Sequence, residues 1–271
     1  MKLVLCMYIL FILSWISSND SFFMYNTFFR IYQKIRLNHQ HNQYKIQRIP
    51  TLNKLIISTP GGLNGFYLLG VSSYLKENYN LSDYLYSGAS AGAWNSLFLS
   101  FRGNNTEFIN NLFCSDIHKA SSVFEIENIM KNIILSKYCY KDFDLEKVNV
   151  GVTVCRWFLR FKMVIYNDFV NLKDAVFCCM ASSHIPFITG GLLYFYRKRC
   201  SFDGGFFSKP YLNMTPILII SPDMWNSTYT YTNFIDNALQ MNRLNVNLTE
   251  LYIQGYNDAK NNKKTLDNIF L

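Results

Sequence analysis

The stretch Tyr84-Leu-Tyr-Ser-Gly-Ala-Ser-Ala-Gly92 joins a short apolar and aromatic run to a turn built from glycine, alanine and serine. Apolar residues then recur at helical spacing as far as about Ser100. The same order of strand, glycine turn and helix occurs earlier, at residues 54–59, 60–62 and 65–78. Two such units in succession are typical of a βαβ arrangement. The sequence therefore predicts an α/β domain whose central sheet is largely parallel and flanked by helices.

The rest of the chain continues this pattern without a linker rich in proline, glycine or serine, so residues 51–271 are interpreted as one domain. The last 40 residues read as helical and polar. The other predicted elements are two helices within 105–137, a helix at 172–182, and strands at 148–155, 158–166, 199–202 and 216–221.

Composition excludes several classes of protein. Half of the 271 residues are hydrophobic and 16% are charged, which supports a sizeable core and excludes global disorder. The seven cysteines are too sparse for a disulfide scaffold and show no spacing typical of a zinc site, so we expect no metal. If Cys6 is removed with a leader, six cysteines remain, a number compatible with disulfides or with none.

The N-terminus is predicted to bring the chain to a membrane. Residues 1–18 contain the apolar run Leu3 to Ile16, which fits a signal peptide or a signal anchor. Residues 1–50 hold +5 of the net charge of +8, and the basic residues within 19–50 are interleaved with aromatic side chains. No nucleic-acid motif accompanies them, so we expect a basic, aromatic segment at a membrane surface rather than a nucleic-acid partner. A solvated leader is the competing interpretation, and a secreted, luminal or cytosol-facing location stays open.

The turn from Gly88 to Gly92 matches the pattern G-x-S-x-G. This pattern requires a tight strand-to-helix bend with small neighbours, which exposes one hydroxyl group. Ser90 would then lie at a helix N-terminus, where the partial positive charge favours a developing oxyanion. The sequence thus predicts Ser90 as a nucleophile. The alternative is a purely structural glycine turn.

A nucleophilic serine needs a base, and two candidates follow it in the sequence. Asp203 ends a short strand and precedes Gly204 and Gly205, which places a carboxylate where another backbone or a substrate approaches closely; a plain Asp-Gly turn is the alternative. His184 is the histidine best placed for a triad, with Asp168 or Asp174 as its acid, but a loop or capping role is favoured for it. A third motif, the glycine turn at 60–65, can aim backbone N–H groups at an anion.

These motifs, in this order, resemble the patatin-like phospholipases, and within them the adiponutrin-type branch. The resemblance covers about residues 52–222. It rests on four stretches: Leu55 to Val71, Tyr86 to Trp94, Ala181 to Phe187 and Ser201 to Gly205.

The resemblance implies a three-layer patatin-like fold and a serine lipid hydrolase that cleaves acyl esters of phospholipids or neutral glycerolipids. Ser90 would be the nucleophile and Asp203 the general base of a dyad without histidine. No cofactor or metal is implied, and the partners would be a lipid substrate and a membrane surface. The oxyanion donors would come from Gly61, Gly62, Leu63 and Ala91, and the motif glycines would be Gly65, Gly88, Gly92, Gly204 and Gly205.

The chain departs from the family pattern at two positions. Pro60 replaces the first loop glycine, which fixes φ near −65° and removes one N–H group. Asn64 stands where many members carry a basic residue. The departure at Pro60 leaves open a lipid-binding or scaffold relative with an impaired site. An acyltransferase that uses the same acyl-enzyme is a third alternative, because the sequence does not show which acceptor reaches the acyl-enzyme. The aromatic residues Trp94, Phe98, Phe101 and Phe187 are expected to line an acyl channel or to be plain core.

Overall fold

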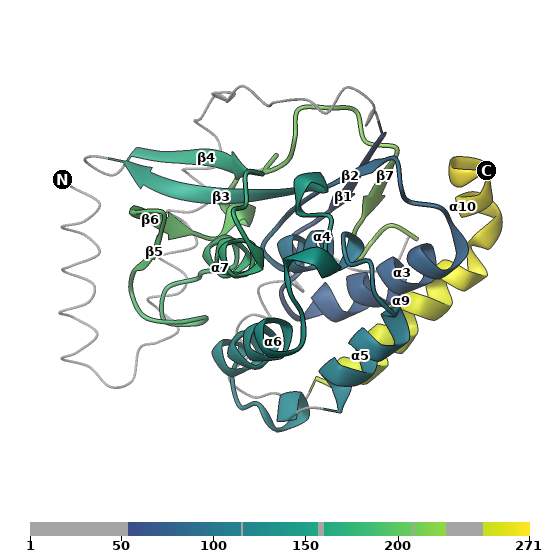
Figure 1. The fold of residues 1–271 in the computed structure, drawn as a ribbon, viewed down its shortest axis with the longest axis horizontal. Helices are drawn as coiled ribbons and strands as arrows, with labels where there is room; N and C mark the ends of the chain where they lie inside the picture. Colours follow the sequence, from purple (N-terminus) through teal and green to yellow (C-terminus); the bar gives the residue numbers. More distant parts are fainter. Residues whose placement is uncertain (1–53, 115, 157–159, 208, 226–245) are drawn as a thin grey trace.

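The computed structural model describes residues 54–114, 116–156, 160–207, 209–225 and 246–271 (Figure 1). The predicted segments 1–18 and 19–50 lie outside these residues. Within them, no helix combines the length and the apolar character needed to cross a membrane.

A central sheet organises the domain, in the order β5-β6-β3-β2-β1-β7, with β4 paired to β3. Its core strands β3, β2, β1 and β7 are parallel. The strands β4, β5 and β6 extend it with antiparallel pairings. The strand bounds are β1 Lys54–Ser58, β2 Tyr84–Ala89, β3 Val148–Arg156, β4 Arg160–Tyr166, β5 Tyr194–Tyr196, β6 Arg199–Phe202 and β7 Leu218–Ile220.

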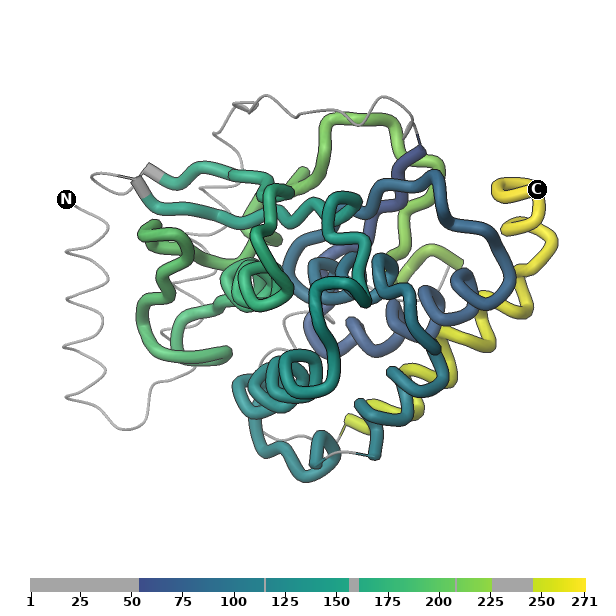
Figure 2. Tube along the Cα trace, in the orientation of Figure 1, coloured from purple at the N-terminus to yellow at the C-terminus, as the bar shows by residue number. Residues whose placement is uncertain are grey.

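Helices flank this sheet, and helices distant in sequence lie side by side. Near the C-terminus, α9 runs along α3, as the path of the tube in Figure 2 makes visible. The α-helix bounds are α3 Gly65–Asn78, α4 Ala91–Leu99, α5 Asn105–Phe113, α6 Val123–Lys137, α7 Leu172–Ser182, α9 Leu248–Asn261 and α10 Lys263–Phe270.

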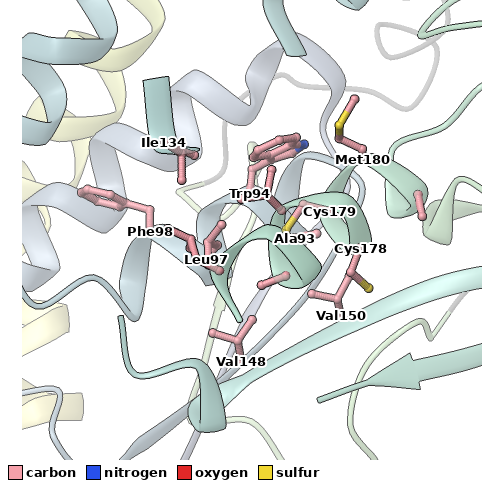
Figure 3. Close-up of a cluster of buried hydrophobic side chains, with 14 of the residues drawn as sticks. Ala93, Trp94, Leu97, Phe98, Ile134, Val148, Val150, Cys178, Cys179 and Met180 are labelled. Atoms are coloured by element: carbon pink, nitrogen blue, oxygen red, sulfur yellow. The ribbon is translucent and has the colours of Figure 1, made fainter. Parts of the chain in front are cut away.

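The core forms where alternate strand side chains meet the helices. In Figure 3, Ala93 and Leu97 of α4 lie beside Val148 and Val150 of β3. Burial of apolar side chains at about 25 cal/mol per Å² is the main force that holds such layers together. The face of β1 that points away from α4 packs its apolar residues against Leu212. Both faces of this strand are therefore covered.

The predicted fold class is confirmed: the chain is a mixed α/β protein with a central sheet, parallel in its core, flanked by helices. The predicted helices 65–78 and 172–182 and the strand 199–202 have the bounds of α3, α7 and β6. The strand expected at 216–221 is shorter, Leu218–Ile220, because only that part pairs with β1. The strand β5 was not predicted from the sequence.

Candidate active site

Two strands bring Ser90 and Asp203 together. β2 pairs with the first half of β3, up to Gly151, and β6 pairs with the second half, from Thr153. Because β4 occupies the other edge of β3, β2 and β6 share one edge and point toward each other. Ser90 follows the end of β2, and Asp203 follows the end of β6. The Ser90 Oγ–H donates a hydrogen bond of 2.6 Å to Asp203 Oδ2.

The backbone of Ser90 has a conformation that is unusual for a residue with a side chain. Its φ is 55° and its ψ is −129°, at a sharp turn from β2 into the N-terminus of α4. Such a conformation costs roughly 1–3 kcal/mol and clusters at functional sites. Small neighbours make the turn feasible, since a Cβ on Gly92 would lie 2.0 Å from the carbonyl oxygen of Ser58. This is the geometry that the G-x-S-x-G pattern requires.

Asp203 is buried, and its surroundings shift its pKa toward a value suited to a general base. Burial raises the pKa of this carboxyl to about 7, because a low-polarity environment disfavours the charged form. Hydrogen bonds from Ser90 Oγ and from the Gly205 N–H, the latter 2.6 Å from Oδ1, act in the opposite direction. A base whose pKa lies near neutral pH can both accept a proton and return it.

A buried hydrogen-bond network positions both residues. The Ser90 N–H donates to Ser182 Oγ at 2.8 Å, and Ser182 Oγ–H donates to the carbonyl of Gly151 at 2.7 Å. Thr153 Oγ1–H donates to the backbone carbonyl of Asp203 at 2.8 Å. Sequence reasoning gave neither Ser182 nor Thr153 a role. Ser182 lies within the stretch Ala181 to Phe187, one of the four that carry the family resemblance, whereas nothing in the local sequence marks Thr153.

The glycine turn lies beside the serine. Gly62, Leu63 and Ala91 line the same cavity as Ser90, whereas Gly61 is not among the lining residues. Ala91 is the first residue of α4, so its N–H has no acceptor within the helix. The left-handed φ of this turn, 55°, falls on Gly62 and not on Pro60. A proline at position 60 is therefore compatible with the turn.

The motif glycines are all packed close to this site. An added Cβ would approach another atom to 2.9 Å or less at each of the five positions: Gly65, Gly88, Gly92, Gly204 and Gly205.

The histidine alternative is not supported by the geometry. The ring of His184 is buried against Tyr194 and Phe202, and burial lowers its pKa. The contact of His184 with the dyad is through its backbone carbonyl, which accepts a hydrogen bond of 2.8 Å from the Asp203 N–H. Its candidate acids, Asp168 and Asp174, are instead ion-paired with Arg197. The described residues thus show no Ser-His-Asp chain.

An apolar cavity opens from Ser90 and has a volume of about 90 Å³. Its walls come from α3, α4, α5, α6 and the segment after α7. Of the four aromatic residues expected to line an acyl channel, Trp94 and Phe98 do so. Phe101 belongs instead to an aromatic core cluster, and Phe187 is on the surface. The apolar lining is completed by Phe66, Leu69, Leu97, Phe108, Leu112, Val123, Ile126, Met130, Ile133, Ile134 and Ile185.

Glu127 is the one ionisable side chain among the described residues that line this cavity. It is buried, and burial raises its pKa to about 8, while hydrogen bonds with Ser183 and Trp94 act in the opposite direction. The negative charge of Asp203 raises it further. Sequence reasoning missed Glu127, because an acid within an amphipathic helix is typical of a solvated surface.

The described residues contain no group of three or more histidine, cysteine, aspartate or glutamate side chains suited to a metal ion. Their six cysteines are free thiols: Cys114, Cys139, Cys155, Cys178, Cys179 and Cys200.

Comparison with known proteins gives similarity to solved structures but not to known sequences. The sequence matches no protein-family model and no curated protein. Among solved structures, the chain is similar to one from the heterodimeric complex ExoU-SpcU of the type III secretion system of Pseudomonas aeruginosa. The TM-score is 0.38 and the identity 11%, over 81% of this chain and 52% of that one, so the chain spans about half of its length. A similarity at this level carries no weight for function, which rests on the site itself.

Proposed function

We propose that this protein is a serine hydrolase of patatin-like type that cleaves acyl esters of lipids, either phospholipids or neutral glycerolipids. The observation that carries the proposal is the 2.6 Å hydrogen bond from Ser90 Oγ to Asp203 Oδ2, next to an apolar cavity. A nucleophile within hydrogen-bond reach of its base is the arrangement that covalent catalysis needs. The strained backbone of Ser90 supports the same role.

The proposed reaction has two stages. Ser90 Oγ attacks the ester carbonyl carbon while Asp203 accepts the hydroxyl proton, and the resulting oxyanion takes hydrogen bonds from N–H groups of Gly62, Leu63 and Ala91. Each well-placed donor contributes about 3–4 kcal/mol to the transition state. The C–O bond to the alcohol then breaks, and Asp203 returns the proton to the departing oxygen. Water repeats the sequence on the acyl-enzyme and releases a fatty acid.

The cavity indicates the acyl chain as the part of the substrate that is bound. Each methylene group transferred from water into such a site contributes about 0.8 kcal/mol. The polar alcohol portion would remain outside, near the loop that follows α7. Residues 1–50, with their apolar run and basic, aromatic segment, are proposed to hold the enzyme at a membrane.

The test is an analysis of products from phosphatidylcholine vesicles and from triacylglycerol emulsions, with glycerol added as an acceptor. Release of free fatty acid supports hydrolysis. Formation of a new glyceride at the expense of fatty acid would support the acyltransferase. Binding of lipid without any product would support a lipid-binding protein and contradict the proposal.

The pH profile of ester hydrolysis is expected to reflect two buried carboxyls. Asp203 accepts the serine proton only when ionised, so kcat/KM for 4-nitrophenyl octanoate should rise with pH and level off above about 7. Glu127 ionises near pH 8 and would place a charge in the cavity that an apolar chain must enter, so kcat/KM should fall above that pH.

Glu127→Gln is the matched variant, because it keeps the shape of the side chain and removes the ionisation. The fall at alkaline pH should disappear in this variant while the rise near pH 7 stays. An alkaline fall that is identical in both proteins would contradict the role assigned to Glu127.

A further inference from the structure

Several exposed apolar side chains lie in one short segment between Ser90 and Asp203 in the sequence. Leu192, Leu193, Phe187 and Phe195 have exposed fractions of 40%, 52%, 56% and 63%. All four lie between α7 and β6, within nine consecutive residues. We call them the apolar loop cluster. Large apolar side chains exposed together on one short segment are typical of an interaction site.

The segment that carries the cluster is held in a defined conformation. Thr189 Oγ1 accepts a hydrogen bond of 2.8 Å from the Ile185 N–H and donates one of 3.0 Å to the Ser183 carbonyl. Phe187 has a φ of 65°, an unfavourable value for an aromatic residue. Loop hydrogen bonds therefore keep the Phe187 ring at the surface although this strains its backbone.

The segment that carries the cluster contains basic residues and no acidic residue of its own. From residue 183 to 199 the chain carries Arg197, Lys198 and Arg199 and no aspartate or glutamate. Arg197 is engaged in ion pairs with Asp168 and Asp174. Lys198, in the turn between β5 and β6, and Arg199, the first residue of β6, are both exposed. Neither of these two side chains forms an ion pair with an acid in the part of the chain that the structure describes. Apolar side chains beside such cations are suited to the interface of an anionic bilayer.

The same segment reaches the candidate site. Ile185 and Thr189 line the cavity that contains Ser90, and Phe187 lies between them in sequence. A lipid held at the cluster would therefore have its acyl chain close to the entrance of that cavity. A protein partner would not require this continuity between an exposed apolar surface and an acyl cavity.

We propose that the apolar loop cluster, together with Lys198 and Arg199, is the surface by which this protein docks on an anionic lipid bilayer and takes its substrate from it. The proposal rests on the proposed function for the substrate, but the docking itself requires no catalysis. It is also separate from the N-terminal segment, since it assigns bilayer contact to residues 187–199.

The test measures insertion at one position and does not depend on how the N-terminus binds. Leu193→Trp and Ile253→Trp are compared in the full chain carrying Ser90→Ala, so that no lipid is hydrolysed. Ile253, on α9, is 49% exposed and provides the matched control. Vesicles of phosphatidylcholine and phosphatidylserine with brominated acyl chains are added, and quenching is corrected for the native tryptophans. A tryptophan at position 193 should lose about half of its added fluorescence because its ring lies at acyl-chain depth, and one at position 253 should not.

A second measurement uses the active enzyme. Leu193→Ser combined with Phe195→Ser should lower hydrolysis of vesicle lipid by about tenfold and leave hydrolysis of soluble 4-nitrophenyl butyrate within about twofold of the native rate. Ile253→Ser should change neither. Equal quenching at positions 193 and 253 would overturn the docking surface. If the enzyme still cleaves the soluble ester, the proposed function survives that result.

Discussion

Replacement of Ser90 by alanine is expected to lower the turnover of lipid and soluble esters by about 10⁴-fold or more, because no other described hydroxyl is placed to form the acyl-enzyme. Alanine has the same Cβ as serine, so the backbone at φ 55° is no more strained than before. The variant should therefore fold. It leaves Asp203 buried without the Ser90 Oγ–H donor, which raises the pKa of Asp203 further.

The measurement is covalent labelling with a fluorophosphonate probe, which reacts with activated serines. Native protein should be labelled and Ser90→Ala should not. Ser96→Ala is a matched control: Ser96 is buried on the same helix, and its Oγ has no hydrogen-bond partner among the described residues. It should keep full labelling. Equal labelling of native protein and Ser90→Ala would remove Ser90 from the role of nucleophile.

The local elements of the fold could be predicted from sequence because local physical signals set their limits. Asn171 precedes α7 and accepts a hydrogen bond of 2.9 Å from the Asp174 N–H, so the helix begins at an ordinary N-cap. The glycine turn and the buried apolar run fixed the start of α3 and the position of β2 in the same way. Interactions between residues close in sequence are sufficient to set the limits of these helices and strands.

The meeting of β2 and β6 on one edge of β3 could not be predicted from local sequence patterns, because strand pairing over long range leaves no local signal, and only the family resemblance implied that Ser90 and Asp203 meet. The sequence placed Ser90 and Asp203 at two strand ends, and only the pairing makes those ends adjacent. Thr153 and Ser182 acquire their roles through the same pairing, since each bonds to a backbone atom of a distant strand or turn. Residue type alone does not identify such positioning groups.

The cavity shows a similar limit for apolar residues. Phe98 and Phe101 lie three positions apart, yet Phe98 lines the cavity and Phe101 packs against Phe143. Hydrophobic periodicity indicates burial but not whether a buried ring faces a void or another ring. Glu127 shows the same limit for a charged residue. It is buried because α6 lies against α4 and α7, and its own sequence surroundings do not indicate this burial.

Asp203→Asn is expected to lower kcat by about 10³-fold, because the asparagine amide keeps the size of the side chain and cannot accept the serine proton. Fluorophosphonate labelling should slow in proportion. The fold should become more resistant to heat at pH 8. An acid whose pKa is raised in the folded state binds more protons there than in the unfolded chain, so stability falls as pH rises from about 4 to about 7. Asparagine removes this loss.

His184→Gln separates the dyad from a triad. Glutamine retains hydrogen-bonding capacity at a buried position, and the Asp203 N–H would still donate to the backbone carbonyl of residue 184. If Asp203 is the base, His184→Gln should keep kcat within about tenfold of the native value, whereas a lost catalytic histidine would cost far more. The unfolding temperature of each variant shows whether a lower rate reflects loss of fold. A folded but inactive His184→Gln beside an active Asp203→Asn would overturn the dyad, since only a histidine base explains that pair of results.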